Sequence, residues 1–108
     1  MKNEFIINQD LTIKDALISI EKNKHRSLIV VDDENRVVGA LSDGDIRKAL
    51  INDIVLTAVI SKIMNTDFLY IKDVANINPN EFMEKKNIFL LPKIDKNHKL
   101  INIFVREY

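Results

Sequence analysis

The stretch Ser27 to Arg47, which reads SLIVVDDENRVVGALSDGDIR, decides the fold of this chain. Residues 27–31 and 36–41 are rich in β-branched and apolar side chains and flank a polar turn of Asp, Glu and Asn. Such a pattern is typical of a β-hairpin. The run Ser42-Asp43-Gly44-Asp45 then breaks the second strand and offers side chains that cap a helix. The stretch therefore predicts two strands followed by a helix.

A strand and a helix are predicted ahead of this hairpin. Residues 4–8 read EFIIN and favour a short strand. Thr12, with Asp15 three residues later, fits a capping box, in which each side chain accepts a hydrogen bond from a free backbone N–H. From Ile13 onward, apolar residues at positions i, i+3, i+4 and i+7 predict a helix with one buried stripe, ending near Lys22.

The second half of the chain begins the same order again. In the connecting segment 56–65 the apolar residues have helical spacing, and residues 68–71 are a candidate strand. The run Asn78-Pro79-Asn80-Glu81 is typical of a helix start, with Asn as N-cap, Pro in the first turn and Glu closing a capping box. Residues 88–91 and 100–105 predict two further strands around a polar turn.

A weak internal repeat supports this interpretation. When the chain is aligned with itself so that Glu21-Lys22 falls on Glu84-Lys85, Asp32 falls on Asp95, and apolar positions around them also match. We call this the repeat alignment. It leads us to expect two related units in one chain.

Composition excludes several classes of protein. The 108 residues are 46% hydrophobic, with 16 basic and 16 acidic side chains, which suits a globular domain and gives no net positive field for nucleic acid or anionic lipid. The chain has no cysteine, so disulfides and thiolate chemistry are excluded. It contains no apolar run long enough to span a bilayer and no signal-peptide pattern. We expect a cytoplasmic protein that binds neither nucleic acid nor membrane.

The residues around the second predicted helix start form the candidate ligand site. Gly39 permits close backbone approach, and the Ser42 hydroxyl stands where free N–H groups at a helix N-terminus favour an anion such as phosphate. A carboxylate such as Asp45 can accept hydrogen bonds from both hydroxyls of a ribose. Leu41 and Asp43 lie between these groups in the sequence.

These residues resemble a known family. The hairpin, the tract from Gly39 to Arg47 and the connecting tract Val59-Ile60-Ser61-Lys62-Ile63-Met64-Asn65 are similar to a tandem pair of cystathionine-β-synthase (CBS) domains, over nearly the whole chain. The resemblance implies that Ser42 faces a phosphate and Asp45 a ribose of an adenine nucleotide, AMP, ADP or ATP. The motif Ser-Asp-Gly-Asp-Ile-Arg resembles that of CBS pairs fused to sugar-phosphate isomerases and, above all, to bacterial sugar nucleotidyltransferases.

The second unit departs from the family pattern. Under the repeat alignment, Gly39 meets Asn102, Ser42 meets Val105 and Asp45 meets Tyr108, and the chain stops before a closing helix. We therefore expect at most one nucleotide site per chain.

Two basic residues extend the candidate site. Arg47 sits one turn beyond the Ser42 motif and can add charge for a di- or triphosphate. Arg26 belongs to a basic cluster that reads either as a solvated helix end or as a phosphate contact at the edge of the cleft.

Alternative interpretations of the polar residues stay open at this point. The tract from Ser42 to Asp45 also fits a simple N-capped turn. His25 and His98 lie in polar turns and are expected to be exposed loop residues without a catalytic role. The pair Asp43 and Asp45 lacks the longer series of oxygen ligands of a calcium loop, so no metal is expected.

The sequence thus predicts an α/β fold of two pseudo-symmetric β-α-β-β-α repeats, the second incomplete. Residues 1–55 form the first repeat, 56–67 the linking segment and 68–108 the second repeat. We expect no enzyme activity and no required cofactor, but a homodimeric regulatory module that senses an adenine nucleotide for an attached or partner enzyme, a sugar nucleotidyltransferase by resemblance. The alternative is a purely structural dimerisation module whose ligand site has decayed.

Overall fold

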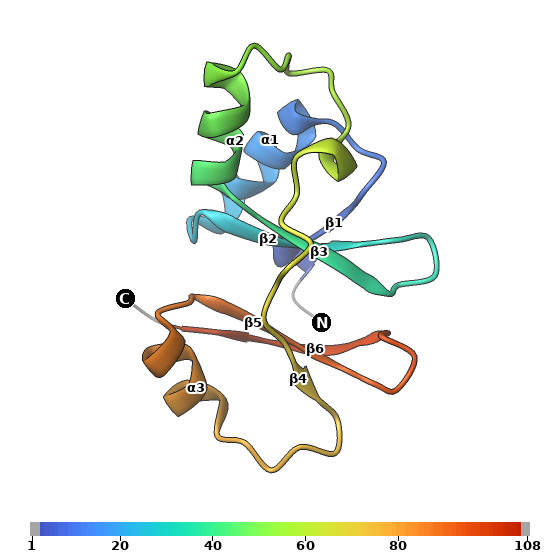
Figure 1. Cartoon of the computed structure of the whole chain (residues 1–108), viewed down its shortest axis with the longest axis vertical. Coiled ribbons are helices and arrows are strands. Elements are labelled where there is room, and N and C mark those ends of the chain that lie inside the picture. Colours follow the sequence, from blue (N-terminus) through green and yellow to red (C-terminus); the bar gives the residue numbers. More distant parts are fainter. Residues whose placement is uncertain (1–2, 107–108) are drawn as a thin grey trace.

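The computed structural model describes residues 3–106, which form two three-stranded sheets with three α-helices (Figure 1). The first half contains η1 (Asn3–Phe5), β1 (Ile6–Asn8), α1 (Ile13–Asn23), β2 (Ser27–Val31), β3 (Val37–Ser42) and α2 (Asp43–Ile51). The second half contains η2 (Ile60–Lys62), β4 (Ile71–Lys72), α3 (Pro79–Lys86), β5 (Leu90–Ile94) and β6 (Leu100–Val105). The predicted α/β class and the repeated order of elements are confirmed. No helix within residues 3–106 is long and apolar enough to cross a membrane.

The first sheet has the order β1-β2-β3, with β1 parallel and β3 antiparallel to β2. The parallel pair needs a crossover, and α1 supplies it. The predicted capping box starts this helix: the Thr12 hydroxyl accepts from the Asp15 N–H at 3.2 Å, and the Asp15 carboxylate accepts from the Thr12 N–H at 2.9 Å. Lys24 ends the helix in the left-handed region.

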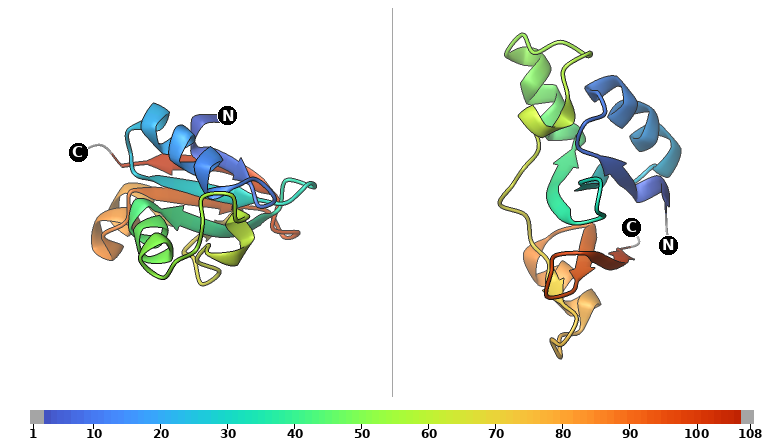
Figure 2. Two further views of the ribbon diagram at one scale, coloured as in Figure 1. Left: turned by 90° about the horizontal axis from the view of Figure 1, so that it is seen from above. Right: turned by 90° about the vertical axis from the view of Figure 1, so that its right-hand side faces the viewer.

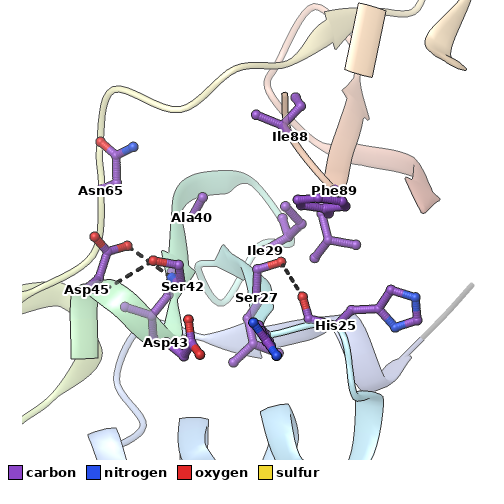
Figure 3. Close-up of a pocket in the computed structure, with 14 residues that line it drawn as sticks. His25, Ser27, Ile29, Ala40, Ser42, Asp43, Asp45, Asn65, Ile88 and Phe89 are labelled. Carbon is purple, nitrogen blue, oxygen red and sulfur yellow. Dashed lines mark hydrogen bonds between the residues drawn. The ribbon is translucent and has the colours of Figure 1, made fainter. Parts of the chain in front are cut away.

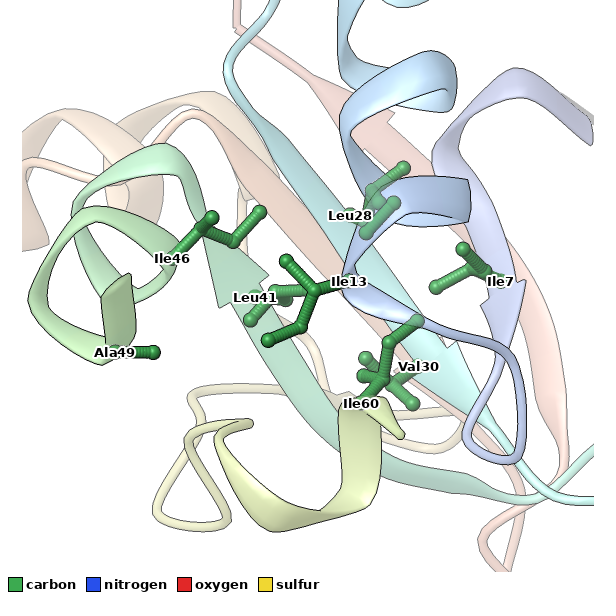
Figure 4. Close-up of a cluster of buried hydrophobic side chains, with 9 residues drawn as sticks. Ile7, Ile13, Leu28, Val30, Leu41, Ile46, Ala49 and Ile60 are labelled. Atoms are coloured by element: carbon green, nitrogen blue, oxygen red, sulfur yellow. The ribbon is translucent and has the colours of Figure 1, made fainter. Parts of the chain in front are cut away.

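One core lies between the first sheet and the helices that cover its outer face (Figure 4). Its members include Ile13, Leu28, Val30, Leu41, Ile46 and Ile60. Each is at most 2% exposed, and full burial of such a side chain contributes about 1.5–3 kcal/mol. This core fixes α2 against β3, and therefore fixes the position of the loop that carries the candidate site.

The second sheet repeats the first in the register that the repeat alignment predicts. The ladder of β2 and β3 slips between Val30 and Val31, and that of β5 and β6 slips at the aligned position, between Lys93 and Ile94. The turns also correspond: Asp32 accepts from the backbone N–H groups of residues 34 and 36, and Asp95 from those of residues 97 and 99. The internal repeat is therefore present in the structure as well as in the sequence.

The two sheets pack against one another, so the chain is layered (Figure 2). A second core between them joins side chains of both repeats, including Ile29, Val37, Leu90, Ile94 and Ile103. The two hairpin turns are also bonded to each other: Val37 N–H donates to the His98 carbonyl at 2.8 Å, and Leu100 N–H donates to the Asn35 carbonyl at 3.0 Å. The repeats are thus related by an approximate two-fold arrangement.

The connecting segment differs from its helical pattern. Only Ile60–Lys62 forms a turn of 3₁₀ helix, because the backbone of this segment bonds to the start of α1 instead. Ile13 N–H donates to the Ala58 carbonyl at 3.0 Å, and Ile60 N–H donates to the Leu11 carbonyl at 2.8 Å. The apolar spacing reflects packing on the first core, where Ile60 is fully buried, rather than a regular helix.

Several element boundaries also differ from those predicted. The first strand begins at Ile6, after a 3₁₀ turn, and β4 is Ile71–Lys72 rather than residues 68–71. β5 begins at Leu90 because the Ile88 N–H is bonded to the Met83 carbonyl at the end of α3. At the start of α3, Asn78 caps two N–H groups, but the predicted return bond from Glu81 is not among the bonds of residues 3–106.

Candidate functional site

A cavity of the described chain, which we call the main cavity, opens where the ends of the two sheets meet (Figure 3). Its volume is about 520 Å³, within the range of small-molecule sites. The first repeat contributes the start of β2, the end of β3 and the start of α2, and the second repeat contributes residues 88–90. A ligand here would contact both repeats at once.

The start of α2 forms the polar wall of the main cavity. Ser42 Oγ accepts from the Asp45 N–H at 3.1 Å, and Asp45 Oδ2 accepts from the Ser42 N–H at 3.0 Å. The tract is therefore a capping box, so the alternative of an N-capped turn describes its structural role correctly. The box leaves the Ser42 hydroxyl proton and Asp45 Oδ1 without partners inside residues 3–106, and both residues line the cavity. Capping and ligand binding are compatible here.

Arg26 is the permanent cation of the cavity lining, and its backbone is in an unusual conformation. Its φ is 62°, in the left-handed region that costs a non-glycine residue free energy. Its carbonyl accepts from the Asp43 N–H at 2.9 Å, which ties the β2 start to the first turn of α2. Arg26 and the helix start are therefore held side by side.

A buried asparagine supports this strained turn. Asn23 is 6% exposed and donates from Nδ2 to the carbonyls of Glu4 and Ser27, both at 3.0 Å. Its Oδ1 accepts from the His25 N–H at 2.8 Å. Because a buried amide is costly unless it is hydrogen-bonded, these contacts define the path of residues 24–27.

The opposite wall is apolar and comes from the second repeat. It consists of Ile88, Phe89 and Leu90. Under the repeat alignment, Ile88 and Phe89 correspond to His25 and Arg26. Corresponding positions of the two repeats thus face the cavity. The side chains are basic in the first repeat and apolar in the second.

The structure brings most of the predicted site residues together. Arg26, Leu41, Ser42, Asp43 and Asp45 all line the main cavity.

Gly39 and Arg47 are not part of this lining. A Cβ at Gly39 would lie 2.7 Å from Met64 Sδ, so the connecting segment, not a ligand, makes the close approach to this glycine. Arg47 is exposed, and its guanidinium folds back toward Gly44. Val105, which corresponds to Ser42 under the repeat alignment, packs against the core between the sheets. Tyr108, matched to Asp45, lies outside the described residues.

Sequence reasoning missed several lining residues. Ile88 and Phe89 carry no ligand motif, and the packing of the second repeat on the first brings them to the site. Asn65 also lacks such a motif, and its backbone bonds to Ala40 of β3 bring it there. His25 was expected to be exposed, but it is half-buried, with its ring 5.3 Å from that of Phe5. His98 is exposed as predicted.

The hairpin turn of the first repeat contains two groups with shifted pKa values. The pKa of Asp32 lies below its ordinary value, chiefly because the carboxylate accepts from the Arg36 backbone N–H. The pKa of Arg36 is raised by the same carboxylate. Residues 3–106 also contain no group of three His, Asp or Glu side chains that could hold a metal ion.

Comparison with known proteins identifies the first half directly, because residues 1–52 match the model of the CBS domain. These residues are a CBS domain. The whole chain has the fold of solved CBS-domain proteins. A putative acetoin utilization protein (AcuB) from Vibrio cholerae is 22% identical, with a TM-score of 0.81 over 93% of this chain and 75% of its own. CBSX2 in complex with AMP is 26% identical, with a TM-score of 0.74 over 94% of this chain and 80% of its own.

Two relatives are much longer proteins, and this chain matches only a small part of each. An uncharacterised protein of Helicobacter pylori strain J99 is 32% identical over 91% of this chain and 30% of its own length. The arabinose 5-phosphate isomerase GutQ of Salmonella typhi is 27% identical over 82% of this chain and 28% of its own. The chain therefore spans less than a third of these relatives.

Proposed function

We propose that this CBS module binds one adenine nucleotide in the main cavity and so regulates an attached or partner enzyme in the cytoplasm. The observation that supports this most is the composition of the cavity. Arg26, Ser42 and Asp45 of the first repeat face the apolar residues Ile88 and Phe89 of the second across about 520 Å³. A nucleotide has the matching anionic, hydroxylated and flat apolar parts.

Each polar group has a distinct role in this proposal. The Arg26 guanidinium and the Ser42 hydroxyl donate to the phosphate, beside the positive end of the α2 dipole. Asp45 Oδ1 accepts from the ribose hydroxyls, while Oδ2 continues to cap the helix. The base lies against the apolar wall. The solved complex of CBSX2 with AMP supports an adenine nucleotide as the ligand.

Regulation follows from the position of the ligand between the repeats. A ligand that contacts both sheets stabilises one arrangement of the repeats, and an attached domain can sense that arrangement. The similarity to GutQ supports a partner that acts on sugar phosphates. More specifically, the Ser-Asp-Gly-Asp-Ile-Arg motif favours a sugar nucleotidyltransferase as the partner enzyme.

A second candidate function is structural dimerisation without a ligand. Exposed apolar side chains on and after α2 favour it: Ile51 is 74% exposed, Val55 62% and Leu56 42%. A homodimer that covers these side chains is compatible with both functions. Light scattering on the isolated chain should give twice 12.5 kDa, and a monomer at every accessible concentration would contradict the dimer.

Thermal unfolding with a ligand panel tests the nucleotide proposal. The panel contains AMP, ADP, ATP and S-adenosylmethionine, with CMP and GMP as controls. A ligand that binds only the folded chain at about 100 times its Kd stabilises it by about 2.7 kcal/mol. We expect at least one adenine compound to raise the melting temperature, followed by saturable heat in calorimetry. If none does so, the structural candidate is favoured.

A further inference from the structure

A smaller cavity of about 220 Å³ adjoins the main cavity, and we call it the side cavity. The two cavities share Ile29, Ala40, Asn65, Ile88 and Leu90. Four of these residues are apolar, and Asn65 is the polar one. The shared region is thus an apolar slot with a single carboxamide at its edge.

The order of groups along the two cavities orients a ligand. Arg26, Ser42 and Asp45 line the main cavity and not the side cavity, so a sugar phosphate belongs at the far end of the main cavity. The planar base then extends into the shared slot, where its faces meet aliphatic side chains. Its polar edge meets Asn65.

The backbone of Asn65 is held firmly in this position. Its N–H donates to the Ala40 carbonyl at 2.8 Å, and its carbonyl accepts from the Ala40 N–H at 2.9 Å. This pair of bonds attaches the connecting segment to the outer edge of β3. The side chain therefore projects from a rigid support rather than from a free loop.

The orientation of the amide is also determined. Asn65 Oδ1 accepts from the Asp67 N–H at 2.9 Å, which identifies the oxygen end of the side chain. Nδ2 then points the other way and makes no hydrogen bond within residues 3–106. In Figure 3 the nitrogen lies on the side of Asn65 that faces Ile88. A donor is left available at the edge of the slot.

We infer that Asn65 is a specificity-determining residue that donates from Nδ2 to a ring nitrogen of the purine base of the ligand. A second lone pair on Oδ1 can accept from a neighbouring exocyclic amino group, which is the pairing that carboxamides make with adenine. The inference rests on the proposed nucleotide function and adds to it the group that recognises the base.

Asn65→Asp is the decisive variant, because it keeps an oxygen for the Asp67 N–H and removes the N–H donor. Calorimetry compares AMP with a series of AMP analogues in which each ring nitrogen in turn is replaced by C–H. We expect the wild type to bind one analogue about three- to tenfold more weakly than AMP, and Asn65→Asp to bind that analogue and AMP equally. The ratio of the affinities for AMP and the analogue is insensitive to the negative charge that Asn65→Asp adds, because both ligands carry the same phosphate.

Thr66→Ala is the matched control on the same segment, since Thr66 lines neither cavity. It should keep the wild-type affinities and the wild-type ratio. The inference is overturned if Asn65→Asp discriminates among the analogues as the wild type does, or if the wild type binds all of them equally. If the wild type binds no AMP at all, the proposed nucleotide function itself fails, which is a different result.

Discussion

At the scale of single residues, the candidate site uses side chains that also hold the fold together. Ser42 and Asp45 cap α2, and Arg26 accepts a hydrogen bond from the first turn of that helix through its carbonyl. The effects of substitutions on binding and on stability must therefore be separated.

Asp45→Ala should weaken nucleotide binding and also destabilise the chain slightly. Loss of the ribose contacts should cost about 1.5–3 kcal/mol of affinity, and loss of a carboxylate at the helix N-terminus about 0.3–1 kcal/mol of stability. Asp45→Asn is the control, because it keeps an oxygen for the Ser42 N–H. Calorimetry and urea unfolding measure the two quantities. Unchanged affinity in folded Asp45→Ala would remove the ribose from this loop.

Arg26→Gly should weaken ligand affinity without lowering the stability of the chain. Glycine adopts a φ of 62° without strain, so stability should be unchanged or should rise by up to about 1 kcal/mol, while affinity for phosphate-bearing ligands falls. Arg47→Ala, outside the cavity lining, should keep the wild-type affinity. A variant that binds AMP as tightly as wild type would exclude Arg26 from the phosphate site.

At the scale of elements, the packing of the connecting segment on β3 decides the shape of the site. Asn65 reaches the cavity because the segment crosses β3 where Gly39 has no side chain. Turns are the other determinant, because the bonds of Asp32 and Asp95 set the register of the two hairpins.

Gly39→Ala should destabilise the chain by about 1–3 kcal/mol through overpacking. Its Cβ would lie 2.7 Å from Met64 Sδ and 3.2 Å from the Asn65 carbonyl oxygen, so both the side chain and the segment must shift. Gly44→Ala is the matched control, because a Cβ there would meet its nearest neighbours at 3.6 and 3.7 Å, an ordinary contact distance. Denaturant unfolding measures both variants. Equal stability of the two would show that the segment is not tightly packed on β3.

Asp32→Asn should reduce the loss of stability in acid. The pKa of Asp32 is held below 3.8, first by the Arg36 backbone N–H and also by the Arg36 side chain and the Glu34 N–H. A lowered pKa in the folded state gives stability that is complete above the unfolded value and is lost as the pH falls through the folded value. The variant should therefore be less stable than wild type near neutrality and converge with it in acid. A constant difference at every pH would contradict this.

At the scale of the whole molecule, the two repeats share a sheet topology but differ at their ligand-facing positions. Val105 stands where the first repeat has Ser42, and it packs against the core between the sheets. It has no hydroxyl for a phosphate. A second ligand of the same kind would bury polar groups without partners.

Titration calorimetry should therefore give at most one nucleotide per chain. Photo-crosslinking should place that nucleotide nearer Ser42 than Val105. Two equivalent sites, or a crosslink to Val105, would show that the second repeat binds a ligand by different contacts.

Much of the fold was determined by the sequence alone, because its signals are local. The capping boxes of Thr12 with Asp15 and of Ser42 with Asp45 join residues three apart, and the hairpin turns are set by side chains that bond to N–H groups two and four residues away. Five of the seven predicted site residues line the main cavity. Four of them lie close together in the sequence, at the end of β3 and the start of α2. The fifth, Arg26, lies just before the neighbouring strand β2.

The rest was decided by tertiary structure. The connecting segment has helical spacing, but it bonds to the start of α1 and to β3, because those long-range partners offer its backbone better hydrogen bonds than an isolated helical turn. Gly39 faces this segment instead of the cavity for the same reason. Ile88 and Phe89 reach the site only when the two sheets pack together, and Asn65 only when the connecting segment bonds to β3. No local pattern of residues encodes these contacts.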